Sequence, residues 1–221
     1  MTSHRHILPV AALAVLPFGA LAGATGTPQS ALDWLRAGAG FETRLHDGGT
    51  WAAEGGEIYA TDPLTLWNRR DAPLRVPESP ARLVGLQETT EGRTAFMALI
   101  WSDAPVVCGK ELSVIGVDTG LAGFLTPADL AALDDYGRPH EGELYVGPYA
   151  DQLDAQYPTV PFLVELPGGA RFPVSGSGWG DGGYPVASLH DAQGRMVALY
   201  AQFITGDKGW LDPPPCPAQN S

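Results

Sequence analysis

Three aspartates and one histidine are the side chains of this sequence best suited to acid–base chemistry. Asp62 precedes a proline, Asp118 begins an Asp-Thr-Gly turn, and Asp181 lies between two glycines. Two carboxylates held within about 8 Å of each other around a pocket can act as general acid and general base in hydrolysis. His190 is a further candidate, since a histidine can serve as base for a serine or an aspartate. A hydrolase that uses clustered aspartates is therefore one hypothesis.

None of the familiar catalytic motifs is complete. Aspartic proteases place two Asp-Thr-Gly turns together so that the aspartates share a proton, but this chain has one such turn, followed by Leu121 where those enzymes usually have a small residue. A nucleophile elbow needs glycine two residues before and after its serine, whereas Ser177 is flanked by Ser175 and Trp179. The sequence therefore does not decide whether the protein is an enzyme, but the incomplete motifs favour a non-enzymatic protein.

A glycine-rich stretch, SGSGWGDGGYPV at residues 175–186, is the strongest candidate for ligand binding. It lacks the Gly-Lys-Ser/Thr ending of a phosphate loop and the alternating acids of a calcium loop. Trp179 and Tyr184 offer aromatic surface for stacking, while Ser177, Asp181 and the loop amides offer hydrogen bonds. We therefore favour a non-enzymatic protein that binds a partner protein, a glycan or a small molecule.

The net charge argues against nucleic-acid binding, and the spacing of histidines and cysteines argues against a metal site. Lys and Arg number 13 against 25 Asp and Glu, which gives a formal net charge of −12 and works against nucleic-acid binding, because phosphate recognition depends on basic residues. His46, His140 and His190 show no metal-ligand spacing with each other or with the two cysteines. We expect no metal site and no cofactor.

A third hypothesis assigns these motifs to the fold alone. In that case Asp118 and Asp181 bond to nearby backbone amides, Trp179 fills the core, and the glycines supply positive φ angles. Function would then lie in variable surface loops such as the one from Asp134 to Asp154. Burial of Trp179 distinguishes this hypothesis from ligand binding.

The elements that position these residues are predicted to be short strands, because 28 glycines and 20 prolines divide the chain. Short helices are expected after Ser30, with a stop at Gly38, and after Thr126-Pro127, where Asp129 falls in the first turn. Residues 190–195 predict a hairpin turn. The predicted fold is mainly β: a single-domain antiparallel sandwich or partly open barrel with one or two short helices. The predicted strands are Glu57 to Thr61, Arg82 to Gln87, Arg93 to Trp101, Glu111 to Asp118, Val160 to Leu166, Tyr184 to Leu189 and Met196 to Ile204.

The N-terminus is typical of a secretory signal. A basic start at residues 4–6 precedes an apolar run from Ile7 to Leu21, and Ala20-Leu21-Ala22 matches a signal-peptidase site. The run is too short and too broken by proline to span a bilayer. We predict a cleaved signal peptide at 1–22, a segment with a short helix at 23–55, a β-rich domain at 56–204 and a proline-rich tail at 205–221. The protein is then secreted or periplasmic, without stable membrane insertion after cleavage.

Cys108 and Cys216 are the two cysteines of the chain. In an exported protein such a pair favours a disulfide, which would fasten the proline-rich tail to the domain. Two free thiols are the alternative, because pairing geometry cannot be derived from sequence.

Three segments resemble the bacterial family named domain of unknown function 4241. They are GEIYATDPL at 56–64, GVDTGLAGFLTPADL at 116–130 and SGWGDGGYPVASLHDAQGRMVALYAQF at 177–203, in the family's order. The last is the most specific, because the glycine run, the Tyr-Pro pair and the Asp-x-x-Gly-Arg hairpin fall in register. The resemblance implies a single domain over residues 56–203 and no particular activity, cofactor or catalytic residue.

Overall fold

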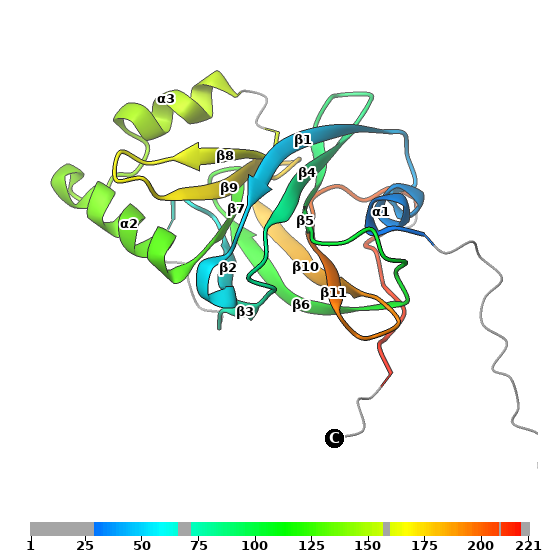
Figure 1. Cartoon of the computed structure of the whole chain (residues 1–221). Coiled ribbons are helices and arrows are strands. Elements are labelled where there is room, and N and C mark those ends of the chain that lie inside the picture. Colours follow the sequence, from blue (N-terminus) through cyan, green and yellow to red (C-terminus); the bar gives the residue numbers. More distant parts are fainter. Residues whose placement is uncertain (1–28, 66–71, 157–159, 208, 218–221) are drawn as a thin grey trace, which may run out of the picture.

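The chain folds into two antiparallel sheets (Figure 1). The structure is a computed structural model that describes residues 29–65, 72–156, 160–207 and 209–217 of the 221; the predicted signal peptide lies outside them. The larger sheet has six strands in the order β1-β4-β5-β11-β10-β6. In that order the strands are Thr43–Trp51, Ala81–Glu88, Thr94–Ile100, Met196–Gln202, Gly182–His190 and Cys108–Val117.

The second sheet has five strands in the order β3-β2-β7-β9-β8. These strands are Leu74–Arg75, Glu57–Thr61, Leu121–Leu125, Arg171–Gly176 and Phe162–Glu165. Within the described residues neither sheet closes into a barrel. The predicted mainly β, antiparallel fold is therefore confirmed.

Within the residues that the structure describes, three α-helices and two short 3-10 helices complete the fold. Helix α1 (Ala31–Ala39) packs on the six-stranded sheet, whereas α2 (Pro127–Gly137) and α3 (Gly147–Ala155) lie beside the five-stranded one (Figure 1). The 3-10 helices are η1 (Glu54–Gly56) and η3 (Arg138–His140). Apolar side chains gather in two buried clusters, a larger one that includes α1 and a smaller one that includes α2 and α3. Each fully buried large side chain contributes roughly 1.5 to 3 kcal/mol to folding.

The predicted helix starts are confirmed by their caps. The Ser30 hydroxyl accepts the Asp33 N–H at 3.3 Å, and Thr126 forms a reciprocal capping box with Asp129. Helix α1 does not stop at Gly38, as predicted, but continues to a left-handed Gly40 (φ 77°). Gly38 instead accommodates Leu211 of the tail, whose side chain would lie 2.4 Å from any Cβ at this position.

Four strands and one helix were not predicted, and each has a local cause. Strand β1 is mostly polar and is interrupted by a bulge between Asp47 and Gly49. Strand β7 is buried along its whole length and therefore lacks alternation, and β9 contains Pro173. Strand β3 has two residues. Helix α3 begins at Gly147-Pro148 without a capping side chain, and therefore has no start signal in the sequence. The segment from Asp134 to Asp154 was expected to be a surface loop but is largely helical.

Cys108 and Cys216 form the predicted disulfide. The bond fastens the tail beside β6, where the Gly109 N–H donates to the Pro214 carbonyl at 2.9 Å. Further along the tail, the Leu211 N–H donates to the Gln202 side chain at 2.8 Å. The tail is thus part of the fold. Among the described helices, none combines the length and the apolar character needed to cross a membrane.

Candidate functional site

Asp62 is a buried anchor for the Asp-Thr-Gly turn. Its side chain lies at the end of β2 and is fully buried. One carboxylate oxygen accepts the N–H groups of Asp118 and Thr119 at 2.9 and 2.8 Å, and the other accepts the Leu64 N–H at 2.9 Å. The Thr119 hydroxyl lies 2.8 and 2.9 Å from the two oxygens. These donors occupy the carboxylate, so Asp62 holds a turn and does not face a substrate.

The other two aspartates lie near this anchor but on the surface. Strands β6 and β10 pair Val117 with Gly182, which places Asp118 and Asp181 at neighbouring strand ends, both exposed. Among the described residues, no three His, Cys, Asp or Glu side chains gather closely enough to hold a metal ion. Asp62 thus anchors the turn that Asp118 begins, a role that the sequence did not assign to Asp62.

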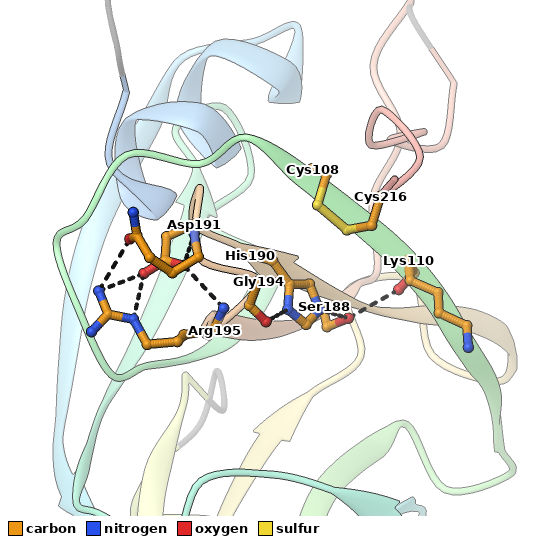
Figure 2. The surroundings of a disulfide bond; sticks show 9 residues. Cys108, Lys110, Ser188, His190, Asp191, Gly194, Arg195 and Cys216 are labelled. Carbon is orange, nitrogen blue, oxygen red and sulfur yellow. Dashed lines mark hydrogen bonds and ion pairs between the residues drawn. A yellow bond between two sulfur atoms is a disulfide. The ribbon is translucent and has the colours of Figure 1, made fainter. Parts of the chain in front are cut away.

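His190 lies at the opposite end of β10 from Asp181, roughly 30 Å away along an extended strand. Figure 2 shows its ring between two oxygens: Nδ1 is 3.2 Å from the Gly194 carbonyl and Nε2 is 2.9 Å from the Ser188 hydroxyl. Because a carbonyl only accepts, Nδ1 carries a proton and Nε2 is free to accept from Ser188. Ser188 is 1% exposed, however, and its hydroxyl also lies 3.4 Å from the Lys110 carbonyl. The pair braces the sheet beside the disulfide.

The glycine loop has a buried brace and an exposed tip. The hydroxyls of Ser177 and Tyr184 both donate to the Gly180 carbonyl, at 2.7 and 2.8 Å, and both side chains are buried. Burial raises the pKa of the Tyr184 hydroxyl. Gly178 has φ 69°, and a Cβ there would lie 2.9 Å from the Thr94 carbonyl. Of the four predicted ligand residues, Ser177 and Tyr184 therefore shape the loop.

Trp179 is 58% exposed at the tip of this loop. Asp181 is also exposed and accepts no hydrogen bond from the described part of the chain. The structure thus answers the question left by the sequence: Trp179 is not a core side chain. An exposed tryptophan on a braced loop is a feature of binding surfaces.

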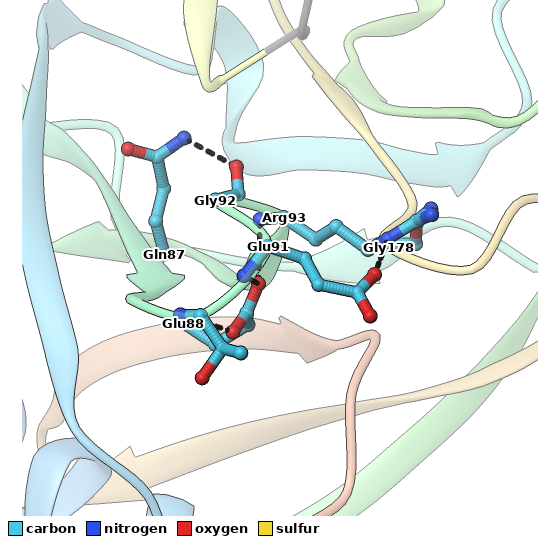
Figure 3. Close-up of polar contacts among 7 residues, drawn as sticks. Gln87, Glu88, Glu91, Gly92, Arg93 and Gly178 are labelled. Atoms are coloured by element: carbon cyan, nitrogen blue, oxygen red, sulfur yellow. Dashed lines mark hydrogen bonds and ion pairs between the residues drawn. The ribbon is translucent and has the colours of Figure 1, made fainter.

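Arg93 covers one face of Trp179. It belongs to the tip of the β4–β5 hairpin, and its guanidinium carbon lies 4.5 Å from the centre of the indole ring. Figure 3 shows how the arginine is held: it donates to Glu91 at 2.8 Å and to the Gly178 carbonyl at 3.0 Å. A planar guanidinium fixed on an indole face restricts the ring.

Glu88 holds this hairpin tip in place. Its carboxylate accepts the N–H groups of Thr90, Glu91 and Arg93 at 2.7, 2.7 and 3.0 Å. Burial alone would raise the pKa of Glu88. The hydrogen bonds from the backbone N–H groups together have a larger, opposite effect, so the pKa lies below its ordinary value. The carboxylate is charged at neutral pH and keeps Arg93 in position over the tryptophan.

Trp179 and Arg93 form one wall of a cleft of about 740 Å³. Further walls come from Leu64 and Thr65, the turn at residues 119–121 and the glycine loop at 176–180. Gly92 and Thr94 flank Arg93 in the lining. The remaining lining residues belong to the segment from Asp134 to Asp154, expected to be a loop, and are Gly142, Glu143, Tyr145, Leu153 and Asp154.

Tyr145 is the second exposed aromatic side chain of the cleft, at 48%. Its N–H donates to Glu143 at 2.9 Å, and its hydroxyl forms a short hydrogen bond to Asp154. The bond to Asp154 raises the pKa of this hydroxyl. Tyr145 therefore takes the place in the cleft that the sequence assigned to Tyr184.

Sequence reasoning missed Arg93, Tyr145 and Asp154. Arg93 lies 85 residues from Gly178, and nothing local marks that contact. A usable signal was the Glu-x-x-x-Gly-Arg order at 88–93, which resembles the recognised turn at 191–195. No protein-family model, curated protein or solved structure matches this chain, and the resemblance to the domain of unknown function 4241 family stays a prediction.

Proposed function

We propose that this chain is an exported binding protein that holds a small-molecule ligand in the cleft beside Trp179. The observation that carries the proposal is a tryptophan 58% exposed on the wall of a cleft of about 740 Å³. This volume falls within the range of roughly 300 to 1,000 Å³ that is usual for small-molecule sites. The six glycines of the lining allow a ligand to approach the backbone closely.

Binding is favoured over hydrolysis by the state of the polar side chains. The Asp62 carboxylate is occupied by four donor groups, and the Ser188 hydroxyl is buried in the sheet. His190 lies at the far end of β10 from the cleft. A reactive group needs access to its substrate, which the buried Asp62 and Ser188 side chains lack, and His190 does not line this cleft.

Export is supported by the signal-like N-terminus and by the disulfide, since disulfides persist mainly in oxidising compartments. We place the protein in the periplasm or outside the cell. We also propose membership of the domain of unknown function 4241 family, on the three segments that resemble it.

A thermal-shift screen tests the proposal. A library of glycans and of neutral, cationic and anionic small molecules is added to the full chain, to Trp179→Ala and to Trp210→Ala. Trp210 is a matched control, because it is 48% exposed and does not line the cleft. A ligand at a hundredfold excess over its Kd stabilises the native state by about 2.7 kcal/mol. We expect hits that stabilise wild type and Trp210→Ala but not Trp179→Ala. Equal stabilisation of Trp179→Ala, or no hit at all, contradicts the proposal.

A further inference from the structure

The charged side chains of the cleft are unequally paired. Arg93 is engaged by Glu91 at 2.8 Å and by the Gly178 carbonyl at 3.0 Å. Glu143 and Asp154, which also line the cleft, each use one carboxylate oxygen to accept a hydrogen bond from Tyr145. Neither forms an ion pair within the described part of the chain. The cleft therefore carries negative charge that no described cation balances.

A buried hydroxyl beside the same cleft has no hydrogen-bond partner among the described residues. Thr65 is 4% exposed and lines the cleft, and its Oγ1 forms no hydrogen bond with the described residues. Leaving a buried polar atom unpaired is costly, so the Thr65 hydroxyl gains a hydrogen bond if its side chain turns toward a ligand donor in the cleft. A hydroxyl oxygen accepts an N–H donor as readily as it donates.

We propose that the ligand is an organic cation, a protonated primary or secondary amine on an apolar body. This inference rests on the function proposed above. The ammonium N–H groups donate to the unused oxygens of Glu143 and Asp154 and to the Thr65 hydroxyl, while the apolar body packs on Trp179 and Leu153. The formal net charge of −12 raises the local concentration of cations around the molecule.

Other ligand charges fit less well. An anion meets two carboxylates and finds the guanidinium of Arg93 already paired with Glu91. A neutral saccharide can stack on Trp179 but gains nothing from the negative charge. A zwitterion places its carboxylate in the same position as an anion. Cation selectivity is thus the property that separates these classes.

Calorimetric titration with three matched probes tests this inference. Phenethylamine, 2-phenylethanol and 3-phenylpropionate share a phenyl body and differ in charge. We expect phenethylamine to bind two- to fivefold more tightly than the alcohol, about the effect of one exposed ion pair, and the carboxylate to bind most weakly. The preference should shrink as salt is raised from about 0.05 to 0.5 M, because exposed charges are screened.

Variants assign the preference to the acidic wall. Asp154→Asn should reduce it, whereas Asp151→Asn should not, since Asp151 is an exposed acid of the same helix outside the lining. Tyr145→Phe removes the hydroxyl bonded to Asp154 and should keep the preference. Equal or tighter Trp179-dependent binding of the alcohol, or of a neutral glycan, overturns the inference and leaves the proposed function standing. Absence of any Trp179-dependent binding across the probes and the library contradicts both.

Discussion

Two hairpin turns of this molecule share a plan and differ in where their arginine goes. One runs from Glu88 to Arg93 between β4 and β5, and the other from Asp191 to Arg195 between β10 and β11. In each, an acidic side chain at the start accepts backbone N–H groups of the turn. In each, the glycine before the arginine has positive φ, 71° in one and 73° in the other. Both acids have a lowered pKa: burial raises it, and the hydrogen bonds to the turn lower it more.

The difference lies in the last residue. Arg195 turns back and pairs with Asp191 at 2.8 Å, so that turn is closed on itself (Figure 2). The Arg93 side chain does not return to Glu88 but extends to the Gly178 carbonyl (Figure 3). There its guanidinium covers the Trp179 ring. The same kind of turn thus stabilises a hairpin at one end of the molecule and forms part of the proposed binding surface at the other. The closed turn lies beside the disulfide, and the open one beside the cleft.

The largest expected effect comes from removing the disulfide next to the closed turn. Cys108 and Cys216 enclose a loop of 108 residues, for which the chain-entropy model predicts about 4 to 5 kcal/mol of stabilisation. The double substitution to serine should lower the free energy of unfolding by this amount in a urea titration. Ligand affinity at a temperature where the variant stays folded should not change. A large loss of affinity would show that the two ends are not independent.

The second effect concerns the buried carboxylate under the cleft. Asp62→Ala leaves the N–H groups of Asp118 and Thr119 without their acceptor, and the expected loss is about 3 kcal/mol. Because Thr119 lines the cleft, ligand affinity should fall as well, unlike in the cysteine variant. Urea unfolding and calorimetry on the same samples measure both quantities. Asp181→Ala is the control, as an exposed aspartate whose loss should change stability by less than about 0.5 kcal/mol.

Local features of the fold were predictable from the sequence. The start of helix α2 is defined within four residues by Thr126, Pro127 and Asp129. The hairpin turn between β10 and β11 is marked by Gly194, which has positive φ. Both signals depend only on near neighbours in the chain. The run from Thr94 to Ile100 was predictable as a strand because it consists of apolar residues and one β-branched threonine, which suits a buried central strand.

The candidate site was predictable only in part, because its contacts are long-range. The loop that carries Trp179 was found from composition, but the acceptor of the Asp-Thr-Gly turn is 56 residues away in the chain. Tyr145 lies just before α3, whose start has no capping side chain, and its hydroxyl bonds to Asp154 of that helix. Trp179 is exposed and Tyr184 is buried. Two aromatic residues five positions apart in one glycine-rich stretch give no sequence signal for which of them is exposed.

A third prediction compares the two arginines directly. Arg93→Ala removes a cation–π contact worth about 0.5 to 1 kcal/mol, so Trp179 should gain mobility and ligand affinity should fall about two- to fivefold. Arg195→Ala should leave the cleft unchanged, since Arg195 contacts its own turn. Calorimetry and the indole NMR signal of Trp179 measure the two effects. Equal loss of affinity in both variants would remove the distinction between the open and the closed turn.

The smallest expected effect is the acid response of the open turn. The folded pKa of Glu88 is lowered, so its stabilising contribution is complete above the unfolded pKa of about 4.5 and disappears as pH falls through the lower folded value. The carboxylate is largely accessible to solvent, and screening limits the contribution to about 0.5 kcal/mol or less. Within this pH range the indole signal of Trp179 should shift as Arg93 loses its support, and in Glu88→Gln it should stay constant. The Arg195 side-chain signals should follow Asp191 instead, because its carboxylate is their direct partner. A Trp179 signal that titrates unchanged in Glu88→Gln would mean that the arginine is held by Glu91 and Gly178 alone.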